Sequence, residues 1–243
     1  MSGSLCVIPA KGCSTRLPRK NMLLLNGHPL IAHSIRKAIK SVLFDVVCVS
    51  TEDAEIAETA RRYGAEVPFM RPDELSRDPA TIIDVVRHAV GYFSEDEFSF
   101  DDIIVLLPTA PFVTVDDLRR AKEKFVESGA DSLLSVTMTE FPPFNAWLVD
   151  GEADGERLVP CFPDSPYKYV KSTECPKTYR SNGAVLILSG AQLAAKKDYR
   201  SMSAVPYIMP PERSIDIDTQ FEFSLAQQLV ESGLVEQQME IFL

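Results

Sequence analysis

The chain has 243 residues, of which 45% are hydrophobic, so it can bury one sizeable core, and we expect one domain over residues 1–243 with an inserted arm rather than two separate domains. Its net charge of −10 argues against nucleic acid or an anionic membrane as the main partner, and it makes any local cluster of cations informative. The five cysteines are odd in number and form no C-x-x-C pair, which is typical of a reduced protein. The first residues resemble neither a signal peptide nor a membrane span. Together these observations favour a cytoplasmic protein.

Strand and helix patterns alternate along most of the chain. Apolar runs predict strands at residues 4–10, 44–51, 65–70, 101–108, 130–137, 182–188 and 204–209. Apolar residues at helical spacing predict helices at residues 29–41, 52–64, 81–93, 114–129 and 218–232, and Thr114 is a candidate N-cap for the fourth of these. The alternation is typical of an α/β fold with a mostly parallel sheet and helices on both faces.

The first strand leads into a basic loop, "PAKGCSTRLPRKN", at residues 9–21. Its cations are Lys11, Arg16, Arg19 and Lys20, and small residues occupy positions 12–15. In open α/β sheets, ligands bind beyond the carboxyl ends of strands, where the N–H groups of small residues can converge on phosphate oxygens and cations can neutralise their charge. The spacing matches neither a Walker loop nor a dinucleotide-binding loop. The loop therefore predicts a site for a nucleoside triphosphate, and the alternative is a solvated loop with surface lysines.

Further cations follow the third predicted strand, in the segment "MRPDELSRDPATIIDV". Arg71 and Arg77 could contact a nucleotide, whereas Ser76, Asp78 and Thr81 are candidate helix caps. In isolation, a nucleotide contact and ordinary capping with surface arginines are equally good interpretations of this segment.

Between residues 138 and 178 the α/β pattern stops. The segment is rich in proline and aromatic residues, has a hairpin-like turn around residues 150–156 and lacks a long amphipathic helix. A long irregular segment of this kind is usually functional or packs elsewhere, and a dense set of aromatic residues commonly anchors an interface. We therefore expect an arm that joins two copies of the chain as a homodimer, and the alternative is an arm that folds back on its own domain.

A pair of carboxylates, Asp216 and Asp218, lies in "SIDIDT" at the start of the last predicted helix. In an extended segment this spacing puts both carboxylates on one face and turns Ile215 and Ile217 towards the core. Two hard oxygen ligands suit Mg²⁺, which also takes substrate phosphates and water as ligands. The spacing supports equally well an alternative in which Asp218 is the N-cap of the last helix.

Together these segments resemble the acylneuraminate cytidylyltransferase family, the nucleotidyltransferases that make CMP-activated sialic-type sugar acids. The matching stretches are "IPAKGCSTRLPRKN", "VSTEDAEIAETARRYGAEVPFMRPDELSRD", "LLPTAPF", "YRSNGAVLI" and "SIDIDT", which occur in the family's order and cover nearly all the chain. The resemblance implies a Rossmann-like nucleotidyltransferase fold with an inserted dimerisation arm. It also implies a Mg²⁺-dependent transfer of CMP from CTP to the anomeric hydroxyl of a nonulosonic sugar acid, with release of pyrophosphate.

The resemblance further implies roles for individual residues. Catalytic roles fall on Lys20, Asp216 and Asp218, and the two aspartates would hold the metal. Contacts to CTP are implied for Lys11, Gly12, Ser14, Arg16, Lys20, Asn21, Arg71 and Thr81. Contacts to the sugar acid are implied for Pro108, Thr109, Lys168, Tyr179, Arg180 and Asn182.

Some positions depart from the family pattern. Lys11 stands where the family usually has arginine, which keeps the charge but loses the fork geometry. Leu107 stands where sialic-acid enzymes often have glutamine. The stretch "LPTAPF" is closer to relatives that act on pseudaminic or legionaminic acid. The stretch "SIDIDT" is instead closer to the sialic and legionaminic branch. The identity of the sugar acid therefore stays open.

Two other functions stay open beside the main one. The first is another sugar nucleotidyltransferase, such as the cytidylyltransferase for 3-deoxy-manno-octulosonate, to which "STRLP" is similar. The second is a non-catalytic nucleotide-binding module of the same fold, although Lys20, Asn21, Asp216 and Asp218 favour an enzyme.

Overall fold

The computed structural model describes residues 2–94, 99–151, 155–195, 202–235 and 239–242. The strands of its main sheet are β1 (Ser2–Pro9), β4 (Val46–Ser50), β5 (Ser99–Val105), β6 (Ser132–Met138), β9 (Tyr179–Ser189) and β10 (Ala204–Ile208). They lie in the order β10-β6-β9-β5-β1-β4. Neighbouring strands run parallel except at β9, which is antiparallel to both β5 and β6. Two short strands, β2 (Leu24–Leu25) and β3 (His28–Pro29), form a separate antiparallel pair.

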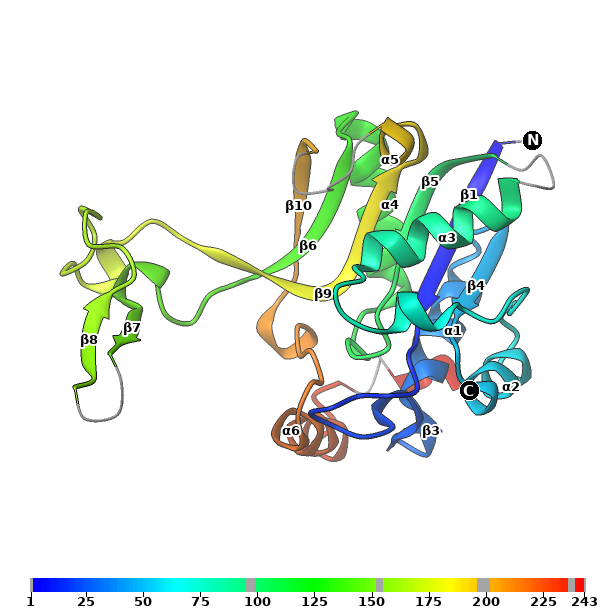
Figure 1. Cartoon of the computed structure of the whole chain (residues 1–243), viewed down its shortest axis with the longest axis horizontal. Helices are drawn as coiled ribbons and strands as arrows, with labels where there is room; N and C mark the ends of the chain where they lie inside the picture. Colours follow the sequence, from blue (N-terminus) through cyan, green and yellow to red (C-terminus); the bar gives the residue numbers. More distant parts are fainter. Residues whose placement is uncertain (1, 95–98, 152–154, 196–201, 236–238, 243) are drawn as a thin grey trace.

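Helices cover both faces of this sheet (Figure 1). They are α1 (Leu30–Ser41), α2 (Ala54–Arg62), α3 (Ile82–Ser94), α4 (Val115–Ser128), α5 (Gly190–Ala195) and α6 (Gln220–Glu231). Alternation along β1 explains the two layers, because Cys6 and Ile8 join the core under α1, α2 and α4, while Leu5 and Val7 join the core under α3 and α5. Within the described ranges, no helix combines the length and apolarity that crossing a membrane requires.

The predicted mostly parallel α/β fold is confirmed, and five of the six helices form near their predicted bounds. Thr114 caps α4 as predicted, in a capping box with Asp117. The strand predicted at residues 65–70 is wrong, since in that stretch only Glu66 bridges to Cys48. Pro68, which lacks an N–H group, ends the pairing. Sequence patterns predicted neither the short helix α5 nor the antiparallel direction of β9.

A third apolar cluster fixes the two segments that carry the predicted site. It joins Leu17 of the opening loop and Ile217 of the segment 214–218 to Phe112 and to Phe223 on α6. Ile217 is fully buried, as the predicted alternation requires. The amide of Ile217 also donates to the carbonyl of Thr109, 2.8 Å away. Both chemically interesting segments are thereby held at the same end of the sheet.

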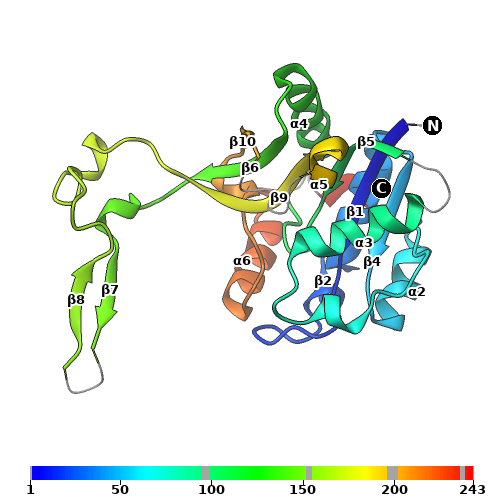
Figure 2. The ribbon, with the colours of Figure 1, turned by 45° about the horizontal axis from the view of Figure 1, so that its top comes forward.

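The segment between β6 and β9 leaves the body of the molecule as an arm, residues 139–178 (Figures 1 and 2). At its base the amide of Thr139 donates to the carbonyl of Thr178 at 2.9 Å. Towards its tip, β7 (Trp147–Asp150) and β8 (Arg157–Pro160) form the predicted hairpin. Its strand β7 is exposed along its whole length. The arm therefore buries little of its own apolar surface.

Candidate functional site

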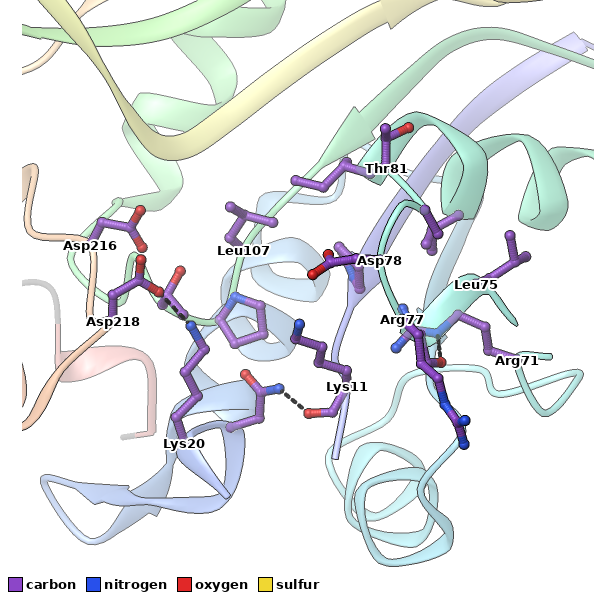
Figure 3. A pocket seen from close by; sticks show the side chains of 18 residues that line it. Lys11, Lys20, Arg71, Leu75, Arg77, Asp78, Thr81, Leu107, Asp216 and Asp218 are labelled. Carbon is purple, nitrogen blue, oxygen red and sulfur yellow. Dashed lines mark hydrogen bonds and ion pairs between the residues drawn. The ribbon is translucent and has the colours of Figure 1, made fainter. Parts of the chain in front are cut away.

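A pocket of about 310 Å³ lies beyond the carboxyl ends of β1, β4 and β5 (Figure 3). Polar and charged side chains from distant segments line it together with an apolar group. The polar lining consists of Lys11, Lys20, Asn21, Arg71, Ser76, Arg77, Asp78, Thr81, Thr109, Asp216 and Asp218. The apolar lining includes Leu75, Ala80, Ile82, Val85 and Leu107. This is the position at which open α/β sheets bind ligands.

Hydrogen bonds within the opening loop and to the residues after β4 fix the conformation of the loop. The buried amide of Asn21 donates to the carbonyl of Lys11 at 2.9 Å, which closes the loop on itself. The N–H group of Gly12 donates to the carboxylate of Glu52 at 2.7 Å, just after β4. Arg19 pairs with Asp53 and Glu55 at the start of α2, and so points away from the pocket-lining cations. Lys11 and Lys20 are thus the loop cations that face the pocket.

Asp218 forms ion pairs with two cations of the opening loop. Its carboxylate lies 2.7 Å from Nζ of Lys20 and 2.5 Å from a terminal nitrogen of Arg16. Burial alone would raise the pKa of Asp218, but the hydrogen bond and charge of Lys20, together with Arg16, lower it. Thr219, not Asp218, is the N-cap of α6, and Glu222 accepts hydrogen bonds from its amide and hydroxyl. The capping alternative for Asp218 is therefore wrong.

Asp216 occupies a more enclosed position at the same end of the pocket. Burial raises its pKa, and the charge of Asp218 adds to this effect, whereas a hydrogen bond from Thr109 partly opposes it. Gly183 faces the carboxylate: it has a φ of +69°, and a Cβ placed there would lie 3.2 Å from Oδ2 of Asp216. A glycine therefore suits both the backbone conformation and the space beside this carboxylate.

The two aspartates form a donor set that fits Mg²⁺. Within the described part of the chain, no group of three or more histidine, cysteine, aspartate or glutamate side chains could hold a metal ion. Magnesium commonly takes one or two carboxylates and completes its shell with phosphates and water. A divalent cation at Asp216 would also offset the two influences, burial and a neighbouring negative charge, that disfavour its ionised form.

The other end of the pocket contains a buried ion pair. The guanidinium of Arg71 lies 2.6 Å from Glu52, and its Nε donates to the hydroxyl of Ser76 at 3.0 Å. Burial alone would raise the pKa of Glu52, but hydrogen bonds from Arg71 and Gly12 lower it. Thr81 hydrogen-bonds to Asp84 through its amide and hydroxyl, which is the arrangement of an N-cap for α3. Ser76 belongs to the ion-pair network and does not cap a helix.

The structure brings about half of the predicted site residues into the pocket. Those that line it are Lys11, Lys20, Asn21, Arg71, Thr81, Pro108, Thr109, Asp216 and Asp218. Those that lie outside its lining are Gly12, Ser14, Arg16, Lys168, Tyr179, Arg180 and Asn182. Of these, Arg16 reaches the site through Asp218, Lys168 lies on the arm, and Asn182 is fully buried.

Sequence reasoning missed one residue that organises this site. Glu52 joins the opening loop to Arg71 by accepting from Gly12 and pairing with the guanidinium. Glu52 lies two residues after the end of β4. Ligand sites in open α/β sheets lie beyond the carboxyl ends of parallel strands, so its position along the chain was a signal that the sequence offered.

Comparison with known proteins identifies the family. A sequence model of the cytidylyltransferase family matches residues 5–241. The chain is 36% identical to the pseudaminic acid cytidylyltransferase of Campylobacter jejuni over 217 residues, which cover 89% of this chain and 91% of that protein. It is 34% identical to the CMP-N,N'-diacetyllegionaminic acid synthase of Legionella pneumophila over 229 residues, which cover 93% of this chain and 96% of that protein.

Among solved structures, the fold is similar to that of CMP:2-keto-3-deoxy-manno-octonic acid synthetase complexed with CTP. The TM-score is 0.69 and the sequence identity 15%, over 95% of this chain and 99% of that chain. This likeness shows a Rossmann-like nucleotidyltransferase fold. With the match of the family model over almost its whole length, the chain belongs to the cytidylyltransferase family.

Proposed function

We propose that this cytidylyltransferase transfers CMP from CTP to the anomeric hydroxyl of a nonulosonic, sialic-type sugar acid and releases pyrophosphate. The observation that carries the proposal is the meeting, in one pocket, of Lys11 and Lys20 from the opening loop with Asp216 and Asp218. Cations and paired carboxylates are what a metal-assisted reaction on a triphosphate needs. The names of the Campylobacter and Legionella relatives support the class of acceptor.

The two ends of the pocket suit different parts of CTP (Figure 3). We infer that the triphosphate lies between Lys11 and Lys20, close to the aspartates. The cytosine would lie near Arg71 and Thr81, where Leu75 and Ile82 offer apolar surface to a flat base. Since Arg71 is already held by Glu52, it would meet the base in a fixed orientation.

In the proposed reaction the anomeric hydroxyl attacks the α-phosphorus of CTP and loses its proton to solvent. The bond from this phosphorus to the bridging oxygen breaks, and pyrophosphate leaves with the electron pair. Lys20 and Arg16 would neutralise the charge on the phosphates, exchanging the carboxylate of Asp218 for phosphate oxygens. The remaining catalysis is positioning, because the phosphates and the hydroxyl must be held in line.

We propose that Asp216 and Asp218 hold Mg²⁺. When bound, the ion would neutralise phosphate charge and help to activate the sugar hydroxyl. The chain itself orients the carboxylate of Asp216. Thr109 holds it by a hydrogen bond, and Gly183, which has no side chain, lets the backbone lie against it.

The acceptor would lie on the β9 side of the aspartates. Arg180 is exposed there, and its guanidinium, which already reaches the carbonyl of Ser214 at 3.3 Å, can pair with the carboxylate of a sugar acid. Leu107 adds an apolar group to the pocket next to Gly183. This apolar neighbour and the names of the two relatives favour pseudaminic or legionaminic acid over N-acetylneuraminic acid.

We further propose that the protein is a homodimer in which each arm reaches the site of the partner. The observation is the exposed apolar surface of the hairpin, where Trp147, Leu148, Val149 and Leu158 are all more than half exposed. Lys168 and Lys171 on the same arm would bring positive charge to an anionic substrate.

The experiment is a matrix of four nucleoside triphosphates against a panel of sugar acids, with Mg²⁺, read as pyrophosphate release. We expect release with CTP and with at least one of pseudaminic, legionaminic or N-acetylneuraminic acid. Release with UTP, with a neutral sugar phosphate or with 3-deoxy-manno-octulosonate alone would instead support another sugar nucleotidyltransferase. Tight binding of CTP with no release for any acid would support a non-catalytic module.

A further inference from the structure

A fully buried polar cluster lies beside the pocket without touching it. It consists of Asn182 on β9, Ser135 on β6 and Ser214 at the start of the segment 214–218, and each is 0% exposed. Buried polar side chains are costly unless every partner is present, so a satisfied cluster of this kind specifies one arrangement of the chain segments that it joins.

The hydrogen bonds of the cluster occupy the whole amide of Asn182. Its Oδ1 accepts from the hydroxyl of Ser135 at 2.6 Å and from the amide of Ala184 at 3.2 Å. Its Nδ2 donates to the hydroxyl of Ser214 at 2.9 Å and to the sulfur of Met209 at 3.3 Å. That hydroxyl in turn donates to the carbonyl of Pro210 at 2.8 Å. No polar atom of Asn182 is left to meet a substrate.

The cluster lies where the pairing between β6 and β9 is interrupted. Leu134 pairs with Leu186, but the next residue pair along the strands is Val136 with Ser181, so β9 bulges by several residues opposite Ser135. The hydroxyl of Ser135 accepts from the amide of Val185 at 2.7 Å and thereby closes the bulge.

The bulge sets the surroundings of Asp216. Gly183 lies within the bulge, and its left-handed conformation brings the backbone against the carboxylate of Asp216. Ser214 lies two residues before Asp216, so its hydrogen bond to Asn182 ties the start of the aspartate segment to the sheet. The amide of Ile217 and the carbonyl of Thr109 fix the other side of Asp216.

We infer that Asn182, Ser135 and Ser214 form a positioning network that fixes the carboxylate of Asp216 for the metal. Asn182 thus acts through Asp216 and does not contact the sugar acid. This inference rests on the proposed function, since it assigns a role to residues around the proposed metal ligand. Partners beyond the direct ligands commonly change metal affinity by about 10- to 100-fold when they are removed.

Mn²⁺ binding in the presence of CTP, followed by the electron paramagnetic resonance of free Mn²⁺, tests the inference without turnover. The variants are Ser214→Ala and Ser135→Ala, which remove one hydroxyl each and are less disruptive than a change at Asn182. The matched control is Ser132→Ala, because Ser132 is a buried serine at the far end of β6 that donates to the carbonyl of Ser203 at 3.3 Å. Thermal unfolding of all three variants measures the purely structural cost.

We expect Ser214→Ala and Ser135→Ala to weaken Mn²⁺ binding about tenfold, with Ser132→Ala within about twofold of the wild type. The KM for the sugar acid should stay within about twofold in all three, because none of these side chains meets the acceptor. Wild-type Mn²⁺ affinity in both network variants, with thermal shifts like that of Ser132→Ala, would overturn the inference alone. If the wild type does not bind Mn²⁺, or if Asp216→Asn binds it as tightly as the wild type, the metal proposal fails and the positioning role is overturned with it.

Discussion

At the pocket, Arg71 and Lys20 are paired and largely buried within one chain, whereas on the arm apolar side chains are exposed to solvent. The guanidinium of Arg71 is 3% exposed beside Glu52, and the side chain of Lys20 is 15% exposed beside Asp218. On the hairpin, Trp147 is 52% exposed. Burying charge is expensive, and exposing apolar surface forgoes a favourable contribution, so each region departs from what stability alone would favour.

The buried charges and the exposed apolar surface differ in where their partners lie. The paired charges of the pocket, Arg71 and Lys20, have their partners in the same chain, and a ligand would exchange those partners. The apolar hairpin has no such cover among the described residues of its own body, so the surface it offers fits another protein surface. The ion pairs of the pocket can therefore be described within one chain, whereas a second copy is needed to test the role of the arm.

The largest expected effect comes from removing a proposed metal ligand. Asp216→Asn should lower kcat by about 10³-fold, or roughly 4 kcal/mol, because a neutral amide is a poorer ligand for a hard cation. Pyrophosphate release measured at rising Mg²⁺ checks this. For Asp218→Asn, kcat should fall by a similar factor while α6 keeps its N-cap, which is Thr219. Full activity of both variants at ordinary Mg²⁺ would show that the pocket does not work through these carboxylates.

The next effect concerns the cation that pairs with Asp218. Lys20→Met should lower kcat/KM for CTP about 100-fold, because the variant loses one positive charge facing the phosphates. Arg120→Gln is the matched control: it removes a cation from an exposed ion pair with Asp116 on α4. Exposed pairs of this kind contribute little, so the control should keep its activity. Equal activities of the two variants would contradict the phosphate-binding role of the opening loop.

The sequence was most informative where structure is local. The helices could be predicted because their apolar spacing and caps lie within a dozen or so neighbouring residues, as Thr114 and Asp117 show for α4. The antiparallel direction of β9 could not, because it depends on the arm returning the chain to the sheet between β6 and β9. Direction in a sheet is a property of connections and not of composition.

The same limit applies to the site. The cations of the opening loop and the pair of aspartates could be recognised as two motifs, but Lys20 and Asp218 are 198 residues apart, and their ion pair exists only in the fold. Glu52 carried no motif of its own. Its importance follows from the meeting of Gly12 and Arg71 at the end of β4, which the order of the strands decides.

A buried lysine on α1 gives a pH-dependent prediction of intermediate size. Lys37 is fully buried on α1 and donates to the carbonyl of Pro111, and burial lowers its pKa from 10.5 to about 7. Above pH 7 the unfolded chain binds a proton at Lys37 that the folded chain lacks, so the free energy of unfolding should rise with pH and fall as pH drops towards 7. Between about pH 7.5 and 9.5 the rise should be roughly 2 kcal/mol.

Urea unfolding of the wild type and of Lys37→Met across this pH range isolates the contribution of Lys37. Other groups titrate equally in both proteins. The free energy of unfolding of Lys37→Met minus that of the wild type should therefore increase by roughly 2 kcal/mol from the high to the low end of the pH range, about 30-fold in the unfolding equilibrium. Parallel curves would mean that Lys37 keeps its ordinary pKa in the folded protein.

The smallest effect, a partial recovery of activity, tests whether the arm completes a site in the partner. A Lys168→Ala/Lys171→Ala variant keeps an intact pocket but has a defective arm, whereas Asp216→Asn keeps an intact arm but has a defective pocket. If each site combines one chain's pocket with the partner's arm, hybrids contain one intact site. Equal mixing with full subunit exchange should then restore about a quarter of wild-type activity.

The control mixture combines Asp216→Asn with Lys20→Met. Both changes lie in the pocket, so every hybrid site is defective and activity should stay at the level of the separate variants. Recovery in both mixtures would point to a trivial cause such as stabilisation on mixing. A dimer that exchanges subunits but shows no recovery in the first mixture would mean that each site is built from a single chain. A solution mass near 27.0 kDa, the mass of one chain, would show that the protein is a monomer. The exposed face of the hairpin would then need a different occupant, because a monomer leaves it in water.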